Sequence, residues 1–318
     1  MSNVICELLG IKYPIIQGAM AWTSVSPLVA AVSEAGGLGV LGVGFAPESV
    51  VEEEVKKTKA LTDKPFAINL FLEDEKVLDA VTEIAIQEKV PVIYSDTLAD
   101  VDYDLAKKYI DIWHQAGIKC VVKIMTVKDA ITADKAGADA VIVKGWEAGG
   151  HVALESTFVL TPLVVDAVNC PVIAGGGIFD GRGIAALNVL GAQGYELGTA
   201  FLLAEECPIH PNAKQAVIEA GDMSTAITGS CTGEPSRQIA NVLSDELLKI
   251  EAEHDKATAS ELLKEVCGGS LRKGMVEGDM KNGAVMVGQN VSAFKEISPA
   301  KEIIVKLVEQ AKEINIDF

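Results

Sequence analysis

The chain repeats one local pattern, in which a helical stretch and a stop of small residues precede a short apolar run. The pattern occurs four times, in SEAGGLGVLG (33–42), HQAGIKCVVKI (114–124), DKAGADAVIV (134–143) and NVLGAQGYELG (188–198). Glycine just past a helix end adopts the left-handed conformation that terminates the helix. The apolar runs are short and β-branched, which is typical of strands buried on both faces of a parallel sheet. The repeat therefore predicts alternating helices and strands.

Four further apolar runs bring the number of predicted strands to eight. They are YPIIQ (13–17), PFAINLFL (65–72), PVIYS (91–95) and CPVIAG (170–175). Helical patterns lie between the runs, among them residues 26–35, 47–61, 76–88 and 103–116. Eight strands that alternate with helices over residues 13–205 predict a (β/α)8 barrel, or TIM barrel. An open doubly wound sheet is the alternative, but QGAMAW follows the first strand where a dinucleotide-binding fold would have GxGxxG.

The alternation stops after residue 205. A helix is expected at 213–221, and residues 222–270 have the pattern of polar helices that do not alternate with strands. A glycine-rich piece follows at 267–289, and a last helix at 299–314. We therefore predict three parts: a barrel over 1–221, a smaller cap over 222–290, and a C-terminal segment over 291–318 whose helix packs back on the barrel.

The charge and the cysteine content exclude several classes of function. With 45 acidic and 27 basic residues the net charge is −18, which argues against nucleic-acid binding because such binding needs a basic surface. No apolar segment is long and uncharged enough to span a membrane, and the N-terminus lacks the pattern of a signal peptide. The six cysteines are scattered, without the spacing of a metal site or a disulfide framework. We expect a cytoplasmic protein with no metal site.

Glycines follow the last two predicted barrel strands. Gly176 and Gly177 come after the seventh strand, and Gly198 and Thr199 come after the eighth. Bare backbone N–H groups can approach an anion closely, and barrels often hold a phosphate at these two strand ends. Each glycine alone could simply turn a loop, but the two loops together predict one phosphate site. A phosphorylated ligand would then lie across the barrel mouth, and FMN fits this description.

Other strand ends offer groups for the rest of an FMN molecule. The flavin ring would reach the backbone of Gly18, Ala19 and Met20 after the first strand, where small residues permit a close approach. Asn69 on the third strand could offer its amide to the ring or to the ribityl chain, although a buried structural asparagine explains it nearly as well. Lys123 lies on the fifth strand and is included in this predicted cofactor site.

The sixth predicted strand runs into VKGWEAGGH (143–151), which holds one of only four histidines in the chain. Further motifs follow the order of one family along nearly the whole chain: YPIIQGAMAW, SEAGGLGVLGVG, DKPFAINLFL, CPVIAGGGIFDG, ELGTAFLLAEE and GAVMVGQ. The sequence resembles the FMN-dependent enoyl-acyl-carrier-protein reductases of type II and, more broadly, the nitronate monooxygenase superfamily. The resemblance implies FMN as cofactor, NADPH or NADH as co-substrate, and His151 as the catalytic residue. It also implies an acyl thioester substrate, carried by acyl carrier protein or coenzyme A, and we expect a homodimer.

His151 suits this chemistry. Histidine titrates near neutrality, so it can donate a hydrogen bond or a proton while negative charge develops on the oxygen of a 2-enoyl thioester. Gly149 and Gly150 would leave room beside it for substrate and cofactor. The same histidine could serve a nitronate monooxygenase, which oxidises alkyl nitronates with O2. A loop histidine without a catalytic role, and an aldolase or isomerase that uses Lys123 or Lys144 for a Schiff base, are further alternatives.

Three features depart from the family pattern. Lys144 replaces the usual glutamine or glutamate, and Glu196 replaces a glutamine; we expect these two side chains to approach each other or the polar edge of the flavin. Asp96 follows the fourth strand, where it either lines the pocket or caps the next helix. Because the chain is acidic, an acidic carrier protein would need a local basic patch, and the candidates are Arg182, Arg237, Arg272 and Lys273.

Overall fold

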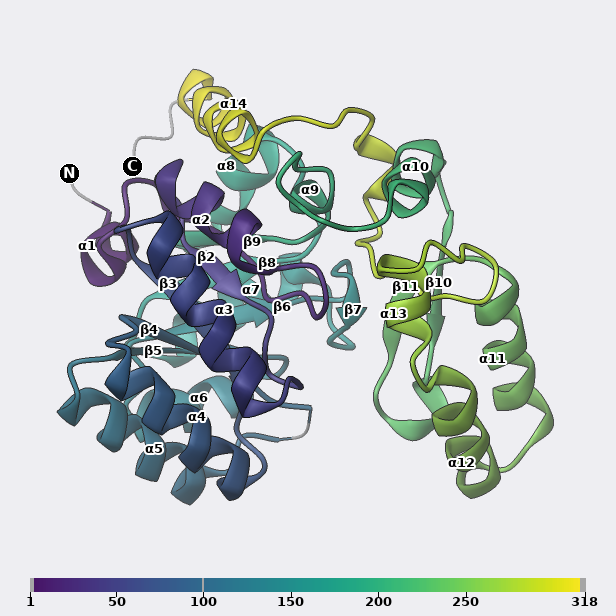
Figure 1. Ribbon diagram of the computed structural model, residues 1–318, viewed down its shortest axis with the longest axis horizontal. Helices are drawn as coiled ribbons and strands as arrows, with labels where there is room; N and C mark the ends of the chain where they lie inside the picture. Colours follow the sequence, from purple (N-terminus) through teal and green to yellow (C-terminus); the bar gives the residue numbers. More distant parts are fainter. Residues whose placement is uncertain (1–2, 99, 315–318) are drawn as a thin grey trace.

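Eight parallel strands form a sheet that closes into a barrel in the computed structural model, which describes residues 3–98 and 100–314 (Figure 1). In spatial order the strands are β1 (Ile15–Gln17), β9 (Gly194–Leu197), β8 (Val172–Gly175), β6 (Ala140–Lys144), β5 (Lys119–Ile124), β4 (Val92–Asp96), β3 (Phe66–Phe71) and β2 (Gly39–Leu41). The Leu38 amide donates to the Ile15 carbonyl at 2.9 Å, which joins the first and last strands. The predicted TIM barrel is confirmed, with all eight strands in the expected places.

Helices cover the outside of the barrel between successive strands. They are α2 (Ser26–Glu34), α3 (Glu48–Leu61), α4 (Glu75–Gln87), α5 (Tyr103–Gln115), α6 (Val127–Ala136), α7 (Thr157–Ala167), α8 (Gly181–Val189) and the short α9 (Thr199–Leu202). Gly137 shows why the repeat stops its helices at glycine, because it ends α6 at φ 104°, in the left-handed region. Among the described residues, no helix is long and apolar enough to cross a membrane.

The barrel strands are apolar on both faces because they separate two cores. On β6, Ala140 and Ile142 face the barrel lumen, whereas Val141 and Val143 pack under the outer helices. This alternation follows from the period of two residues along a strand. The helix α1 (Val4–Leu9), which the sequence pattern did not predict, contributes Ile5 and Leu9 to the lumen core.

A smaller lobe lies beside the barrel mouth and contains strands as well as helices (Figure 1). Its elements include α10 (Pro211–Glu219), β10 (Thr225–Thr228), β11 (Ser236–Ile239), α11 (Val242–Glu253), α12 (Lys256–Cys267) and α13 (Ser270–Met275). The expectation that residues 222–270 contain no strands is therefore wrong. The two strands pair antiparallel across a turn in which Gly229 and Gly233 both have positive φ, and this glycine spacing was the missed signal.

The smaller lobe is joined to the barrel through a third short strand. The strand β7 (Gly150–His151) belongs to the loop that follows β6, yet it pairs antiparallel with β11. Ser236 lies opposite His151 in this ladder. The histidine loop is thus held between the two parts of the molecule.

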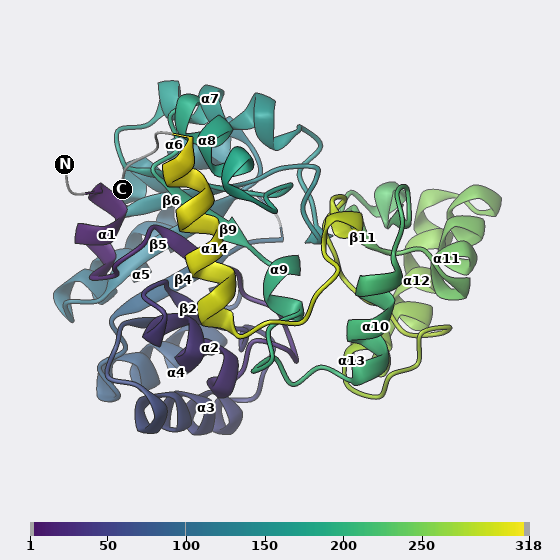
Figure 2. The same ribbon diagram turned by 90° about the horizontal axis from the view of Figure 1, so that it is seen from above.

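The chain finally returns to the barrel through α14 (Ala300–Glu313). This helix packs on the barrel helices α2 and α8, as the view in Figure 2 shows. Residues 315–318 of the third predicted part lie outside the described residues. The division of the chain at residues 221 and 290 stays a proposal.

Candidate active site

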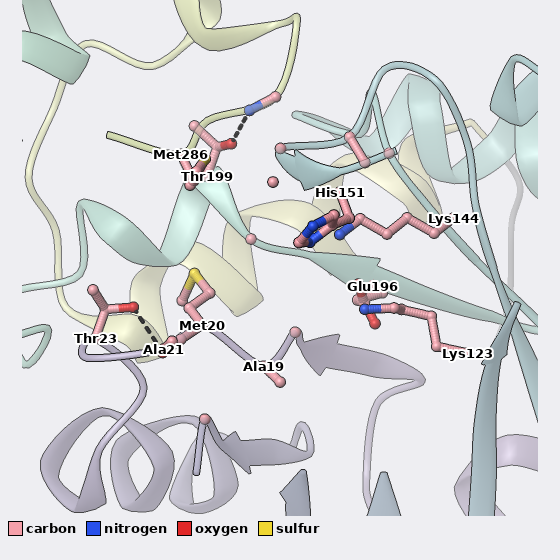
Figure 3. Close-up of a pocket in the computed structure, with 18 of the residues that line it drawn as sticks. Ala19, Met20, Ala21, Thr23, Lys123, Lys144, His151, Glu196, Thr199 and Met286 are labelled. Carbon is pink, nitrogen blue, oxygen red and sulfur yellow. Dashed lines mark hydrogen bonds between the residues drawn. The ribbon is translucent and has the colours of Figure 1, made fainter. Parts of the chain in front are cut away.

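One pocket opens at the carboxyl ends of the barrel strands and continues beneath the smaller lobe (Figure 3). It encloses about 1230 Å3 of space, including its open mouth, which is ample for a cofactor together with part of a substrate. All the predicted site residues line it: Gly18, Ala19, Met20, Asn69, Lys123, Lys144, Gly149, Gly150, His151, Gly176, Gly177, Glu196, Gly198 and Thr199. The structure thus brings the whole predicted set to one place.

The floor of this pocket is the uppermost layer of side chains in the barrel lumen. Asn69, Asp96, Lys123 and Lys144 each stand two residues beyond a residue of the lumen core, so the strand period directs them inward. Figure 3 shows Lys123, Lys144 and Glu196 among the side chains around the pocket. We call Asn69, Asp96, Lys123, Lys144 and Glu196 the polar floor.

Ion pairing on the polar floor involves Lys123. Lys123 pairs with Asp96 on the neighbouring strand, and both side chains are buried. Glu196 accepts a hydrogen bond of 2.5 Å from the Tyr94 hydroxyl instead of pairing with Lys144. Among the described residues Glu196 makes no ion pair with Lys144 within 4.0 Å, but its charge is near enough to raise the pKa of the Lys144 amine, so the structure supports the expected approach of the two side chains. Asp96 lines the pocket and does not cap the next helix, because the N-cap of α5 is Asp102.

Lys144 lies at the end of β6, where its surroundings disfavour the charged form of its amine. Burial and, next to it, the neighbouring charge of Lys123 together lower the pKa of its amine to about 7. Asp96 and Glu196 act in the opposite direction but more weakly. A large part of the Lys144 amine is consequently neutral near pH 7.

His151 lies on β7 and lines the pocket near Lys144 (Figure 3). Burial lowers the pKa of its imidazole to about 4, and the charges of Lys144 and Lys123 act in the same direction. The expectation that this histidine titrates near neutrality is therefore wrong: it is neutral at pH 7. Neither ring nitrogen has a hydrogen-bond partner within residues 3–98 and 100–314, so the imidazole is free to serve a ligand.

The rest of the histidine loop is structural. Glu147 accepts hydrogen bonds from the backbone amide and the hydroxyl of Thr157, at 2.7 and 2.8 Å. A Cβ atom on Gly149 would lie 2.6 Å from the carbonyl carbon of Val287, so this glycine is needed for packing rather than for leaving room for substrate. Gly150 needs its positive φ of 69°.

Arg237 secures the loop from β11. Its guanidinium donates to the Trp146 carbonyl at 3.0 Å and to the Thr225 hydroxyl at 2.8 Å, and it lies 5.4 Å from the centre of the Trp146 ring. Because its side chain is buried, the prediction that Arg237 forms part of a docking patch is wrong.

The predicted phosphate loops lie side by side at the ends of β8 and β9. Gly176 and Gly177 have φ of 112° and 78°, a conformation that favours glycine. Gly198 has an ordinary φ of −109°, and a Cβ there would meet only the Met20 sulfur, at 3.8 Å. Nothing in the described protein therefore excludes a side chain at Gly198, which suits the approach of a ligand to bare backbone.

Backbone donors remain available in the same two loops. In the described part of the chain, the amides of Gly177 and Thr199 donate no hydrogen bond to a protein acceptor. The Thr199 hydroxyl is oriented by accepting a 2.8 Å bond from the Gly288 amide, drawn as a dashed line in Figure 3. These free donors fit the phosphate of FMN.

Several pocket residues were not predicted from the sequence. Phe45 and Phe71 stack at 4.3 Å between ring centres on one side of the mouth. The smaller lobe and the segment after it add Ser236, Leu271, Met275, Met286, Gly288 and Asn290. Met286 and Gly288 belong to the motif GAVMVGQ, but nothing local in the sequence indicates that these residues reach the barrel mouth, because only the fold of the lobe brings them there. The phenylalanines alone had a signal, since they follow β2 and end β3.

Comparisons with known proteins agree with this geometry. Residues 2–310 match the sequence model of the nitronate monooxygenase family. A probable nitronate monooxygenase of Staphylococcus saprophyticus is 31% identical, over 99% of both chains. The (3aS,4S,5R,7aS)-5-hydroxy-7a-methyl-1-oxo-octahydro-1H-indene-4-carboxyl-CoA dehydrogenase of Rhodococcus jostii is 30% identical, over 98% of this chain and 96% of the relative.

Among solved structures, FabK from Thermotoga maritima is similar in fold and sequence. It superposes with a TM-score of 0.92 at 36% identity, over 99% of this chain and 97% of FabK. The family match covers nearly the whole chain, including both the barrel and the smaller lobe. The chain therefore belongs to the nitronate monooxygenase family of oxidoreductases.

Proposed function

We propose that this protein is an FMN-dependent oxidoreductase that reduces trans-2-enoyl thioesters with NADPH or NADH. The observation that carries the proposal is the apolar wall of the pocket that His151 also lines, which Leu271, Met275 and Met286 form on the side of the smaller lobe. An acyl chain needs an extended apolar surface next to the reacting carbons, whereas a small nitronate does not. The wall therefore favours a fatty acyl substrate.

Different pocket residues would bind different parts of FMN. The backbone of Gly176, Gly177, Gly198 and Thr199 would hold the phosphate, and Gly18, Ala19, Met20 and the polar floor would lie against the ring. When bound, FMN would supply the hydride for the β-carbon of the substrate, and the α-carbon would take its proton from water. Binding, orientation and stabilisation of the developing charge fall to the backbone and side chains of the protein.

His151 would act at the thioester carbonyl. As a neutral imidazole it can donate one N–H hydrogen bond to the carbonyl oxygen, where negative charge develops during reduction. A donor of this kind contributes about 3–4 kcal/mol to transition-state stabilisation. The low pKa makes His151 a hydrogen-bond donor rather than a charged acid at pH 7.

The comparisons support an acyl thioester in two ways. FabK, the neighbour with a TM-score of 0.92, is an enoyl-acyl-carrier-protein reductase of the type that the sequence resembles. The Rhodococcus jostii relative is named for a carboxyl-CoA substrate, which is also a thioester of coenzyme A. A fatty acyl group on acyl carrier protein or coenzyme A is the corresponding proposal here.

Nitronate oxidation is the second candidate. It is favoured by the name of the Staphylococcus saprophyticus relative and by the neutral state of His151, which leaves a ring nitrogen able to accept a proton. In that reaction O2 would reoxidise the flavin. The apolar wall has no role in it.

A paired assay separates the two candidates. Purified protein should be yellow and release FMN on boiling, which tests the cofactor. With crotonyl thioester we expect rapid oxidation of NADPH or NADH, and with an alkyl nitronate little uptake of O2. Uptake of O2 with nitronate, without thioester reduction, would reverse the order of the candidates.

A carrier-protein partner would need a basic surface near the pocket. Arg272 and Lys273 lie on α13 beside the pocket, Arg182 lies on α8, and all three stay candidates for docking an acidic carrier protein. Arg182 is paired with Asp180, and Arg272 is paired with Glu277. A homodimer and a cytoplasmic location stay proposals.

A further inference from the structure

Lys144 is the one floor cation that no protein carboxylate neutralises among the described residues. The other floor lysine, Lys123, is paired with Asp96, and Glu196 is held by the Tyr94 hydroxyl. Within the described chain, no carboxylate oxygen lies within 4.0 Å of the Lys144 amine. An ammonium that is buried without a partner is costly unless a ligand brings negative charge to it.

The position of Lys144 tells which part of a ligand it faces. It stands on the polar floor at the end of β6, and a Cβ on Gly150 would lie 3.8 Å from its amine. The phosphate donors are backbone amides of the loops after β8 and β9. FMN has one other place where negative charge gathers, the N1–C2 carbonyl edge of its reduced ring.

We propose that Lys144 binds the pyrimidine edge of the flavin and holds the reduced ring as an anion through its ammonium group. This inference rests on the proposed function, because it requires FMN in the pocket. When bound, FMN would accept a hydride from NADPH or NADH, which would leave as the oxidised nicotinamide, and the reduced ring would then carry a negative charge at its N1–C2 edge. The Lys144 ammonium would balance this charge without transferring its proton.

The groups around Lys144 make it responsive to this charge. Lys123 on β5 and burial disfavour the ammonium, while Asp96 on β4 and Glu196 on β9 favour it; His151 on β7 and Tyr94 on β4 complete the surroundings. With an amine pKa of about 7, a nearby anion shifts Lys144 fully to the ammonium form. Binding of the reduced, anionic flavin should therefore be accompanied by proton uptake at Lys144 between about pH 7 and pH 8.

The first experiment observes Lys144 directly and needs no variant. Lysines of the flavin-free protein are reductively methylated with 13C-formaldehyde, and the Lys144 signal is followed by NMR against pH. We expect a midpoint near 7 that rises by more than one pH unit when reduced FMN is added. A midpoint that is unchanged by reduced FMN would overturn the inference.

The second experiment compares reduced and oxidised flavin in Lys144→Gln, Lys144→Met and Lys144→Arg. In the two neutral variants we expect affinity for reduced flavin to fall about tenfold relative to oxidised flavin, which corresponds to a midpoint potential lower by about 30 mV for two electrons. The absorbance spectrum of the reduced ring at pH 7 should change from the anionic to the neutral form. Lys144→Arg should retain the anionic spectrum, and Lys128→Gln, on the exposed face of α6, should match the wild type in all readouts.

Riboflavin distinguishes the ring from the phosphate as the partner of Lys144. If Lys144 contacts the ring, Lys144→Gln weakens the binding of reduced riboflavin and reduced FMN by the same factor. Weakened FMN with unchanged riboflavin would assign the lysine to the phosphate and overturn the inference. A protein that binds flavin with no effect of the variants refutes this inference alone, whereas normal effects without thioester reduction refute the proposed reaction alone.

Discussion

The floor and the wall of the pocket are built in opposite ways. The polar floor consists of one amide and four charged side chains near the carboxyl ends of barrel strands, and its strand positions are fixed by the sheet register. The apolar wall comes from α13 and from the segment around Met286, which follow the last barrel strand in the chain. This contrast teaches that the barrel determines where a cofactor lies, while the smaller lobe determines what is placed against it.

The largest expected effect tests the floor. Asp96→Asn removes the partner of a buried ammonium and should lower the free energy of unfolding by about 3–5 kcal/mol, measured by urea denaturation without flavin. Asp100→Asn breaks an exposed pair with Lys128 and is the matched control, expected to change stability by less than about 1 kcal/mol. Equal losses in the two variants would contradict the burial argument. Adding Lys123→Met to Asp96→Asn should restore part of the loss.

The next effect concerns the imidazole of His151, which the pairing of β7 with β11 holds at the pocket. His151→Ala should lower kcat for thioester reduction by about 10²–10³-fold, because one donor to the developing charge is removed. Bound FMN, read from the visible spectrum, should be unchanged. His114→Ala, on the outside of α5, is the control and should keep full turnover. Activity that survives in His151→Ala would remove the catalytic role of this residue.

A smaller effect, on KM for the substrate, distinguishes the role of the apolar wall from that of the polar floor. Met275→Ala shortens the apolar wall, so KM for a long-chain enoyl thioester should rise about tenfold, which is the value of one or two methylene contacts. The affinity for FMN should stay the same, since the floor is untouched. Met223→Ala changes an exposed methionine of the lobe and should leave KM unaltered. A loss of FMN in Met275→Ala would show that the wall also holds the cofactor.

The smallest effect is a pH dependence of stability. The pKa of His151 is lowered to about 4, so between pH 6.5 and pH 4 the unfolded chain binds more protons than the folded one. Stability from this group should therefore fall as the pH drops through that window, by about 1–2 kcal/mol at pH 5 in the flavin-free protein. His151→Gln should remove this part of the decline. An identical pH profile in the variant would place the imidazole in water.

The sequence predicted the barrel and the pocket residues because both depend on local patterns. Short β-branched runs between helices give the strands, and the C-terminal strand ends of a barrel share one face. The pair between Lys123 and Asp96 was within reach of the same reasoning, since consecutive barrel strands are neighbours and both residues lie near the carboxyl ends of theirs. The sequence analysis predicts a cofactor role for Lys123 and a pocket or capping role for Asp96, but no pair between them.

The remaining features depend on contacts between distant segments. Ser236 pairs with His151 across 85 positions of sequence, and no local motif announces that ladder. The low pKa of His151 results from burial under the lobe and from two lysines on other strands. The strands of the lobe were missed because their residues are polar and their glycines were not recognised as a hairpin turn.

The central claim is that one pocket holds a flavin on its floor and an enoyl thioester against its wall. The most direct test is anaerobic: the yellow protein is mixed with NADPH or NADH and then with crotonyl thioester, and the flavin absorbance is followed. We predict that the nicotinamide bleaches the flavin and that the thioester restores its colour without O2. Colour that returns only when O2 is admitted, or bleaching by a nitronate instead of a nicotinamide, would contradict this account.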